Sequence, residues 1–212
     1  IFILVMGGIY AGIFTPTEGA GVGACGTFLI AITKGGMRWD GFVDAILSTG
    51  STTAMIFLIL IGAAIFNAFL GFSELPLLAA DFFQNSGLSP FTVLLGMIAL
   101  YIMLGFVMDS LSMILLTVPI FWPIIAGLDF GLGPDDTKLW FGIISLIVVE
   151  MGLITPPVGL NVFVINSMAK DVPMIETFKG VVPFIVSDFI RVAIIIAFPT
   201  ITLILPKLLA IE

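Results

Sequence analysis

GLITPPVGLN, residues 152–161, interrupts a long apolar run that extends over residues 139–169. Pro156 and Pro157 cannot both lie inside a continuous helix, because each removes a backbone hydrogen bond and clashes with the carbonyl one turn earlier. The helix must therefore unwind here, which frees carbonyl oxygens before the two prolines and N–H groups after them. The sequence predicts a discontinuous helix.

Such a break can bind ions. The freed carbonyls, the Thr155 hydroxyl and two opposed helix ends together offer the oxygens that a dehydrated sodium ion needs, and the N-terminal end of the second half-helix favours an anionic substrate. The alternative is a plain proline kink, which is common in membrane helices. The flanking Gly152, Gly159 and Asn161 favour the binding site.

The composition places the chain in a membrane. Of its 212 residues 60% are hydrophobic and 10% are charged, whereas a soluble domain has about 25% charged residues. The net charge is -7, with no basic patch, so nucleic acid is not an expected partner. There is no His and a single Cys, Cys25, so a transition-metal site, a disulfide and His-based catalysis are not expected either.

Several apolar segments are long enough to cross or enter a bilayer. They are 1–32, 42–70, 91–108 followed by 111–126, 139–169 and 181–205. The first is expected to be broken at Pro16, where Thr15, Thr17 and Glu18 can cap a restarting helix. Residues 71–90 predict a short helix along the membrane interface. Residues 170–180 read as a polar, partly amphipathic connector.

The loop charges predict an orientation. Lys34, Arg38, Lys170 and Lys179 mark the cytoplasmic loops, because basic residues concentrate on that side. The acidic loops then face outward, and segment 91–126 must leave from and return to the outside. That parity fits a re-entrant hairpin and equally a pair of full crossings.

The turn of segment 91–126 favours the re-entrant hairpin. It contains few polar residues, namely Asp109, Ser110 and Ser112, whereas turns in water usually carry more. An ionisable Asp109 between apolar arms indicates a functional or buried polar site. Alternatively, Asp109 merely caps the second arm.

Other charged residues of the apolar segments are expected to be structural. Asp188 and Arg191 lie on one helix face, and Glu150 precedes the proline break by two residues. A salt bridge within the bundle is the expected role for this group.

Three motifs resemble a known family. GGIYAGIFTPTEGAGVGA (7–24), VPIFWPI (118–124) and GLITPPVGLNVFV (152–164) resemble the large membrane subunit of TRAP transporters, the tripartite ATP-independent periplasmic transporters. The resemblance runs over essentially the whole chain. Because the chain begins inside an apolar run with no initiator Met, we expect it to be a fragment of a longer protein. The resemblance implies that it is the C-terminal half of that subunit.

The resemblance implies an all-α integral membrane protein: one repeat of an inverted-repeat elevator transporter, with one re-entrant hairpin and one discontinuous helix. Residues 1–88 would be scaffold helices plus the interfacial helix, and residues 89–212 part of the transport domain. The implied function is sodium-coupled import of organic acids, of the C4-dicarboxylate or sialic acid type, across the bacterial inner membrane. The implied partners are the N-terminal repeat of the same subunit, a small four-helix membrane subunit and a periplasmic substrate-binding protein.

The resemblance also implies which residues bind. The expected sodium ligands come from the hairpin tip and the helix break: Asp109, Ser110, Leu111, Ser112, Gly152, Thr155 and Val158. The expected substrate-binding residues are Pro156, Pro157, Gly159 and Asn161. Sodium is the coupling ion, no cofactor or transition metal is expected, and the chain is not expected to be an enzyme.

Two other classes stay open from the residues alone. An ion channel would line its pore with the hairpin. An intramembrane enzyme would need an acid pair, and Asp109 with Glu150 is the pair that the sequence offers.

Overall fold

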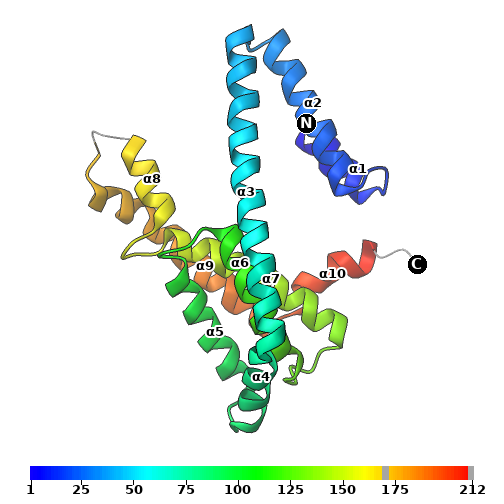
Figure 1. The fold of residues 1–212 in the computed structure, drawn as a ribbon, viewed down its shortest axis with the longest axis vertical. Helices are drawn as coiled ribbons and strands as arrows, with labels where there is room; N and C mark the ends of the chain where they lie inside the picture. The colour runs from blue at the N-terminus through cyan, green and yellow to red at the C-terminus, as the bar shows by residue number, and fades with distance from the viewer. Residues whose placement is uncertain (169–171, 210–212) are drawn as a thin grey trace. The chain divides into compact units, whose positions relative to one another are not determined.

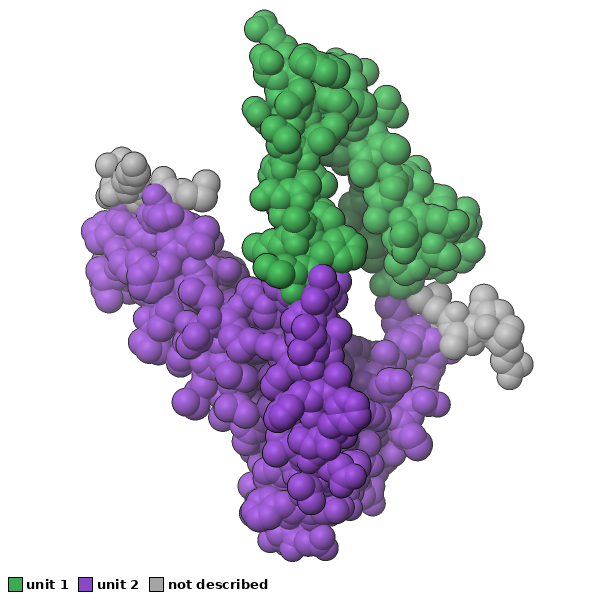
Figure 2. Space-filling view, viewed as in Figure 1, with its two compact units in different colours: residues 1–58 green, residues 59–212 purple. Residues whose placement is uncertain are grey.

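The computed structural model describes residues 1–168 and 172–209, which form helices and no strand. They divide into two compact units, Ile1–Leu58 and Ile59–Glu212 (Figures 1 and 2). The helices of the described residues are α1 (Phe2–Tyr10), α2 (Pro16–Thr33), α3 (Trp39–Ser73), α4 (Leu75–Asn85), α5 (Pro90–Leu104), α6 (Ser110–Ala126), α7 (Pro134–Ile154), α8 (Leu160–Met168), α9 (Met174–Ala197) and α10 (Thr200–Leu209). The all-α prediction is confirmed. Of these helices, α3, α7 and α9 are long and apolar enough to cross a membrane.

In the first unit, the predicted first segment is interrupted between α1 and α2. Thr15 is the N-cap of α2: its hydroxyl accepts the Glu18 N–H at 3.3 Å, and its own N–H donates to Glu18 Oε2 at 2.8 Å. This reciprocal capping satisfies two N–H groups that the helix start would leave unpaired. The expected capping by Thr15 and Glu18 is therefore confirmed, and Thr17 takes no part in it.

In the second unit, α4 lies within the stretch 71–90 where a short helix is predicted, and it packs against α6. Ala80 is the buried residue of α4, and most of its large apolar side chains, such as Leu77 and Phe82, are exposed. The helix has the amphipathic pattern expected at a membrane interface.

The end of the chain differs from the single helix predicted over 181–205. α9 already begins at Met174, so most of the predicted connector is helical. It ends at Ala197, and α10 follows from Thr200. Phe198, with φ -131° and ψ 72°, is not helical, because a following proline, here Pro199, disfavours the α conformation. Lys170, predicted to lie in a cytoplasmic loop, falls outside the described residues.

The core of the second unit is built around α7, which contacts α5, α6, α8, α9 and α10 (Figure 1). Trp140 on α7 is fully buried, and its indole N–H donates to the Ile195 carbonyl of α9 at 3.0 Å. Ile144, Val148 and Val149 continue the same buried face. A helix this thoroughly packed fixes the position of its own C-terminal end, where the proline break lies.

Candidate functional site

The helix is interrupted at the two prolines, as the sequence predicts. α7 ends at Ile154 and α8 begins at Leu160. In a continuous helix the N–H groups of residues 156 and 157 would donate to the carbonyls of Gly152 and Leu153, but proline has no N–H. The Gly152 carbonyl instead accepts the Thr155 N–H at 3.3 Å. The last turn of α7 therefore has carbonyl oxygens without their helical donors.

Thr155 is the C-cap of α7, in an extended conformation, and is half-buried. Its hydroxyl donates to the Met151 carbonyl at 2.6 Å. This bond uses the only hydroxyl proton, so the oxygen keeps its lone pairs for a further partner. The side chain is thus held as an acceptor, which is the state that a cation requires.

Gly159 sets the direction in which α8 restarts. Its φ is +57°, a left-handed conformation that favours glycine. A Cβ built on this residue would lie 3.2 Å from Phe178 Cε1 and 3.3 Å from the Ile154 carbonyl oxygen. The Gly159 carbonyl accepts the N–H of Val162 at 2.8 Å and so starts α8. Any other residue type would be strained by this conformation and crowded by its neighbours.

Between α5 and α6, the predicted hairpin turn carries Asp109 at its end. Asp109 is the N-cap of α6: its Oδ1 accepts the Ser112 N–H at 3.0 Å, and its Oδ2 accepts the Ser112 hydroxyl. Asp109 therefore caps the second arm of the hairpin. Within the described part of the chain, the carbonyls of Phe106, Val107 and Met108 accept no hydrogen bond, so this turn also presents bare oxygens.

A glycine contact joins the hairpin to the helix break. A Cβ on Gly105 would lie 2.7 Å from both Cα and C of Gly152, and a Cβ on Gly152 would lie 3.2 Å from the Tyr101 carbonyl oxygen. The backbones of α5 and α7 therefore touch just before the hairpin turn on α5 and just before the proline break on α7. Sequence reasoning placed Gly152 in the site but missed Gly105. The signal was its position just ahead of the turn, since a glycine there permits close helix approach.

The arms of the hairpin are held together by polar and aromatic contacts that the sequence did not predict. The hydroxyl oxygens of Tyr101 on α5 and Thr117 on α6 are hydrogen-bonded at 3.0 Å, and both side chains are buried. The Tyr101 ring also meets the Phe121 ring edge-on, with centroids 5.1 Å apart. These contacts join the two arms of the hairpin.

The predicted site residues thus form two groups. The turn group is Asp109, Ser110, Leu111 and Ser112, and the break group is Gly152, Thr155, Pro156, Pro157, Val158, Gly159 and Asn161. The Gly105–Gly152 contact joins the two segments, and no hydrogen bond between the groups is present in the described residues. Of the predicted substrate-binding residues, Pro156, Pro157 and Asn161 are exposed and Gly159 is buried.

The charged residues near the site divide as follows. Asp188 and Arg191 form the predicted ion pair, 2.8 Å apart. Glu150 is exposed on α7 and has no ion pair with any described residue. It is therefore not part of the expected salt-bridge group.

Comparison with known proteins identifies the family. The family model for the tripartite ATP-independent periplasmic transporter, DctM component, matches residues 1–201. The large permease protein SiaM of a sialic acid TRAP transporter from Vibrio cholerae is 32% identical over 207 residues, which are 97% of this chain and 47% of that protein. The large permease protein DctM of a C4-dicarboxylate TRAP transporter from Pseudomonas aeruginosa is 33% identical over 208 residues, 98% of this chain and 47% of that protein.

A relative of a third kind is the large permease protein TeaC of an ectoine TRAP transporter from Halomonas elongata, 28% identical over 209 residues, 97% of this chain and 47% of that protein. The chain spans about half the length of these curated relatives. The relatives are permease subunits and not enzymes, in agreement with the apolar helices and the predicted membrane location. The chain belongs to the DctM component family of tripartite ATP-independent periplasmic transporters.

Proposed function

We propose that this chain forms the sodium site and half of the substrate site of a large permease subunit that imports organic acids by sodium coupling. The observation that supports the proposal is the backbone contact between Gly105 and Gly152, which brings the hairpin to the helix break. Two segments with bare carbonyl oxygens then lie side by side. Secondary transporters coordinate sodium in this manner, with unwound carbonyls and half-helix ends.

The sodium ligands would come from both segments. The break offers the Thr155 hydroxyl oxygen and the carbonyls of Gly152 and Val158. The turn offers Asp109, Ser110, Leu111 and Ser112. Although Ser112 donates to both carboxylate oxygens of Asp109, a carboxylate has about four lone-pair sites. Its negative charge can thus still offset that of a cation.

The substrate would bind at the start of α8. Pro156, Pro157 and Asn161 are exposed there, whereas Gly159 is buried and would act through its backbone. The first N–H groups of α8 have no helical partner and attract a carboxylate. Two of the relatives belong to sialic acid and C4-dicarboxylate transporters, which supports a carboxylate as the substrate class.

The hairpin would be re-entrant. α5 has 15 residues and α6 has 17, which at 1.5 Å per residue gives about 22 Å and about 25 Å. The hydrocarbon core is about 30 Å thick, so neither arm spans it comfortably. These lengths support a turn inside the membrane, where irregular backbone is tolerated only in contact with protein or a water-filled cavity.

The remaining parts of the proposal, the domain roles and the partners, rest on what membership of the family implies. Residues 1–88 would belong to the scaffold and residues 89–212 to the moving transport domain of an elevator. The upstream repeat of the same subunit would complete the substrate site. A small membrane subunit would brace the scaffold, and a periplasmic binding protein would deliver the acid to the inner membrane.

Uptake by the full complex tests the function. The permease, its small subunit and its binding protein are reconstituted in liposomes, and uptake of sialic acid or succinate is measured against sodium concentration with potassium as the replacement cation. We expect no uptake in potassium. Thr155→Val should raise the sodium concentration for half-maximal uptake about tenfold, since one oxygen ligand is lost.

Thr155→Ser is the matched control, because it keeps the hydroxyl and removes only a methyl group. It should retain sodium dependence close to that of the wild type. Equal uptake in potassium and sodium would refute the coupling, and an unchanged sodium response in Thr155→Val would remove Thr155 from the site.

A further inference from the structure

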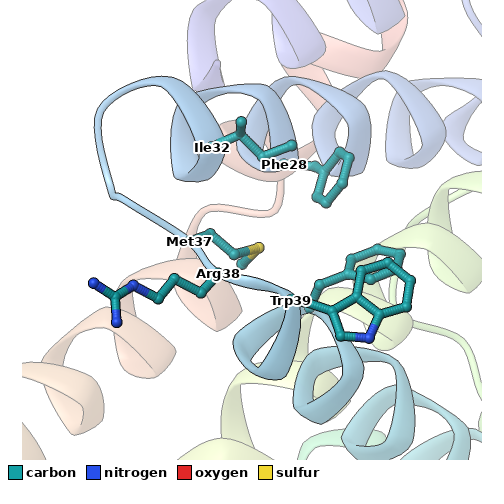
Figure 3. Close-up of a pocket in the computed structure, with 6 residues that line it drawn as sticks. Phe28, Ile32, Met37, Arg38 and Trp39 are labelled. Carbon is teal, nitrogen blue, oxygen red and sulfur yellow. The ribbon is translucent and has the colours of Figure 1, made fainter.

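A groove runs between α2 and α3 in the first unit, far in sequence from the proposed site. Its upper part, shown in Figure 3, is a pocket of about 370 Å³ at the corner between the two helices. The pocket is lined by Phe28, Ile32, Met37, Arg38, Trp39 and Phe42. Four of these side chains are purely apolar, and Arg38 carries the only charge.

The groove continues along the two helices. A second pocket of about 490 Å³ shares Phe28, Met37 and Phe42 with the first and extends to Thr49 and Gly50. From Trp39, where α3 begins, to Gly50 the helix rises about 16 Å at 1.5 Å per residue. This is comparable to the hydrocarbon depth of one leaflet, about 15 Å. The groove therefore has the length of an acyl chain that starts at the membrane surface.

The charge at the top of the groove is not neutralised. Neither Arg38 nor Lys34, four residues earlier at the C-cap of α2, forms an ion pair with any described residue. The nearest acids on α3 are Asp40 and Asp44, and neither lines either pocket.

The residues at the top are of the kind that meets a phosphate at a membrane surface. Figure 3 shows the guanidinium group of Arg38 directed to one side of the pocket and the Trp39 ring at the other. Arginine binds phosphate through two parallel hydrogen bonds. Tryptophan prefers the headgroup level of the bilayer, and basic residues mark the cytoplasmic side, where anionic lipids are found.

We propose that this groove binds an anionic phospholipid of the cytoplasmic leaflet. The phosphate is held by Arg38, and one acyl chain lies along Phe28, Phe42 and Ala45 toward Gly50. The positive charge of Arg38 at the upper end and the apolar groove below it, about one leaflet long, match phosphatidylglycerol in both charge and length. The acyl chain of a zwitterionic lipid would also fit the apolar groove, but its headgroup would leave the charge of Arg38 uncompensated.

Competitive lipid retention tests this proposal. The intact permease is reconstituted in nanodiscs with equal parts of phosphatidylglycerol and phosphatidylcholine and extracted into mild detergent, and the retained lipid is quantified by mass spectrometry. We expect phosphatidylglycerol to be enriched. Arg38→Gln should lower the enrichment about fivefold, the effect of one basic residue at the surface, and Arg38→Lys should lower it less.

Lys179→Gln is the matched control, since it removes one exposed positive charge on the side predicted to be the same. It should leave the enrichment unchanged. Equal retention of the two lipids, or an equal loss in Arg38→Gln and Lys179→Gln, would overturn the headgroup assignment.

The groove itself is tested separately. A Cβ on Gly50 meets no atom within 4 Å, so Gly50→Leu can fill the lower pocket without a clash inside the chain. This variant should lower the retained phosphatidylglycerol while the wild-type charge is kept. A photo-reactive side chain at position 50 should capture lipid. Capture of polypeptide alone would overturn the proposal and indicate that another helix occupies the groove.

Discussion

At the scale of single residues, the site depends on groups that leave a helical pattern. The Thr155 hydroxyl donates a hydrogen bond to the Met151 carbonyl, so the lone pairs of its oxygen stay available. Gly159 adopts a left-handed conformation beside Ile154 and Phe178. Asp109 caps α6 through Ser112. Each of these residues determines the local backbone conformation, and the proposed binding depends on that conformation.

Gly159→Ala should destabilise the protein by about 1–2 kcal/mol, the cost of a left-handed alanine, and more if Phe178 cannot move. Thermal unfolding of the purified variant in detergent measures this loss of stability. Gly142→Ala is the control, because residue 142 lies inside α7, where a Cβ meets nothing within 4 Å, and alanine is the better helix former there. A Gly159→Ala variant as stable as Gly142→Ala would contradict the structure of the break.

Asp109→Asn should separate capping from ion binding. Asparagine caps a helix about as well as aspartate, so thermal stability without sodium should stay near that of the wild type. Sodium affinity should fall, because the negative charge is lost. Asp109→Ala should lose both, with about 1 kcal/mol lower stability from the missing cap. Unchanged sodium affinity in Asp109→Asn would reduce Asp109 to a helix cap.

At the scale of elements, the arrangement rests on how the hairpin meets α7. The backbone of α5 touches that of α7 through two glycines, and Tyr101 and Thr117 join α5 to α6. A shift of any one of the three helices would separate the hairpin turn from the helix break. The proposed ion site would therefore depend on the packing of these helices as well as on its ligands.

Gly105→Ala should disrupt this packing. Its Cβ would lie 2.7 Å from the Gly152 backbone, which cannot rotate away as a side chain would, so we expect a loss of about 1–3 kcal/mol together with weaker sodium binding. Gly96→Ala on the same helix has open space and should be neutral or stabilising. Thermal unfolding and sodium titration of both variants check this; equal behaviour would argue against the contact.

Prediction from sequence succeeded where one residue type dictates the backbone. Pro156 and Pro157 predicted the break, and Thr15 with Glu18 predicted the cap of α2. It failed at Pro199, which carries the same signal for a helix end but was read as part of one apolar helix. Contacts between distant segments, such as Gly105 with Gly152, could not be predicted, because apolar arms without charges carry no pattern that fixes their partner or register.

At the scale of the whole molecule, we propose that the chain works as part of a larger transport complex. It matches its family over residues 1–201 and covers about half of the length of its relatives. With the upstream repeat and the small subunit, uptake should require the binding protein, and omission of that protein should reduce uptake to background. Equal uptake without it would instead favour a channel or a self-sufficient carrier.

The most direct test is sodium-dependent stability of the purified permease, since a ligand that binds only the folded state stabilises it. At about one hundred times its dissociation constant, sodium should add about 2.7 kcal/mol, seen as a rise in Tm that potassium at equal ionic strength does not give. Thr155→Val should lose most of this rise. Equal stabilisation by sodium and potassium, or a full sodium effect in Thr155→Val, would contradict a sodium site at the helix break.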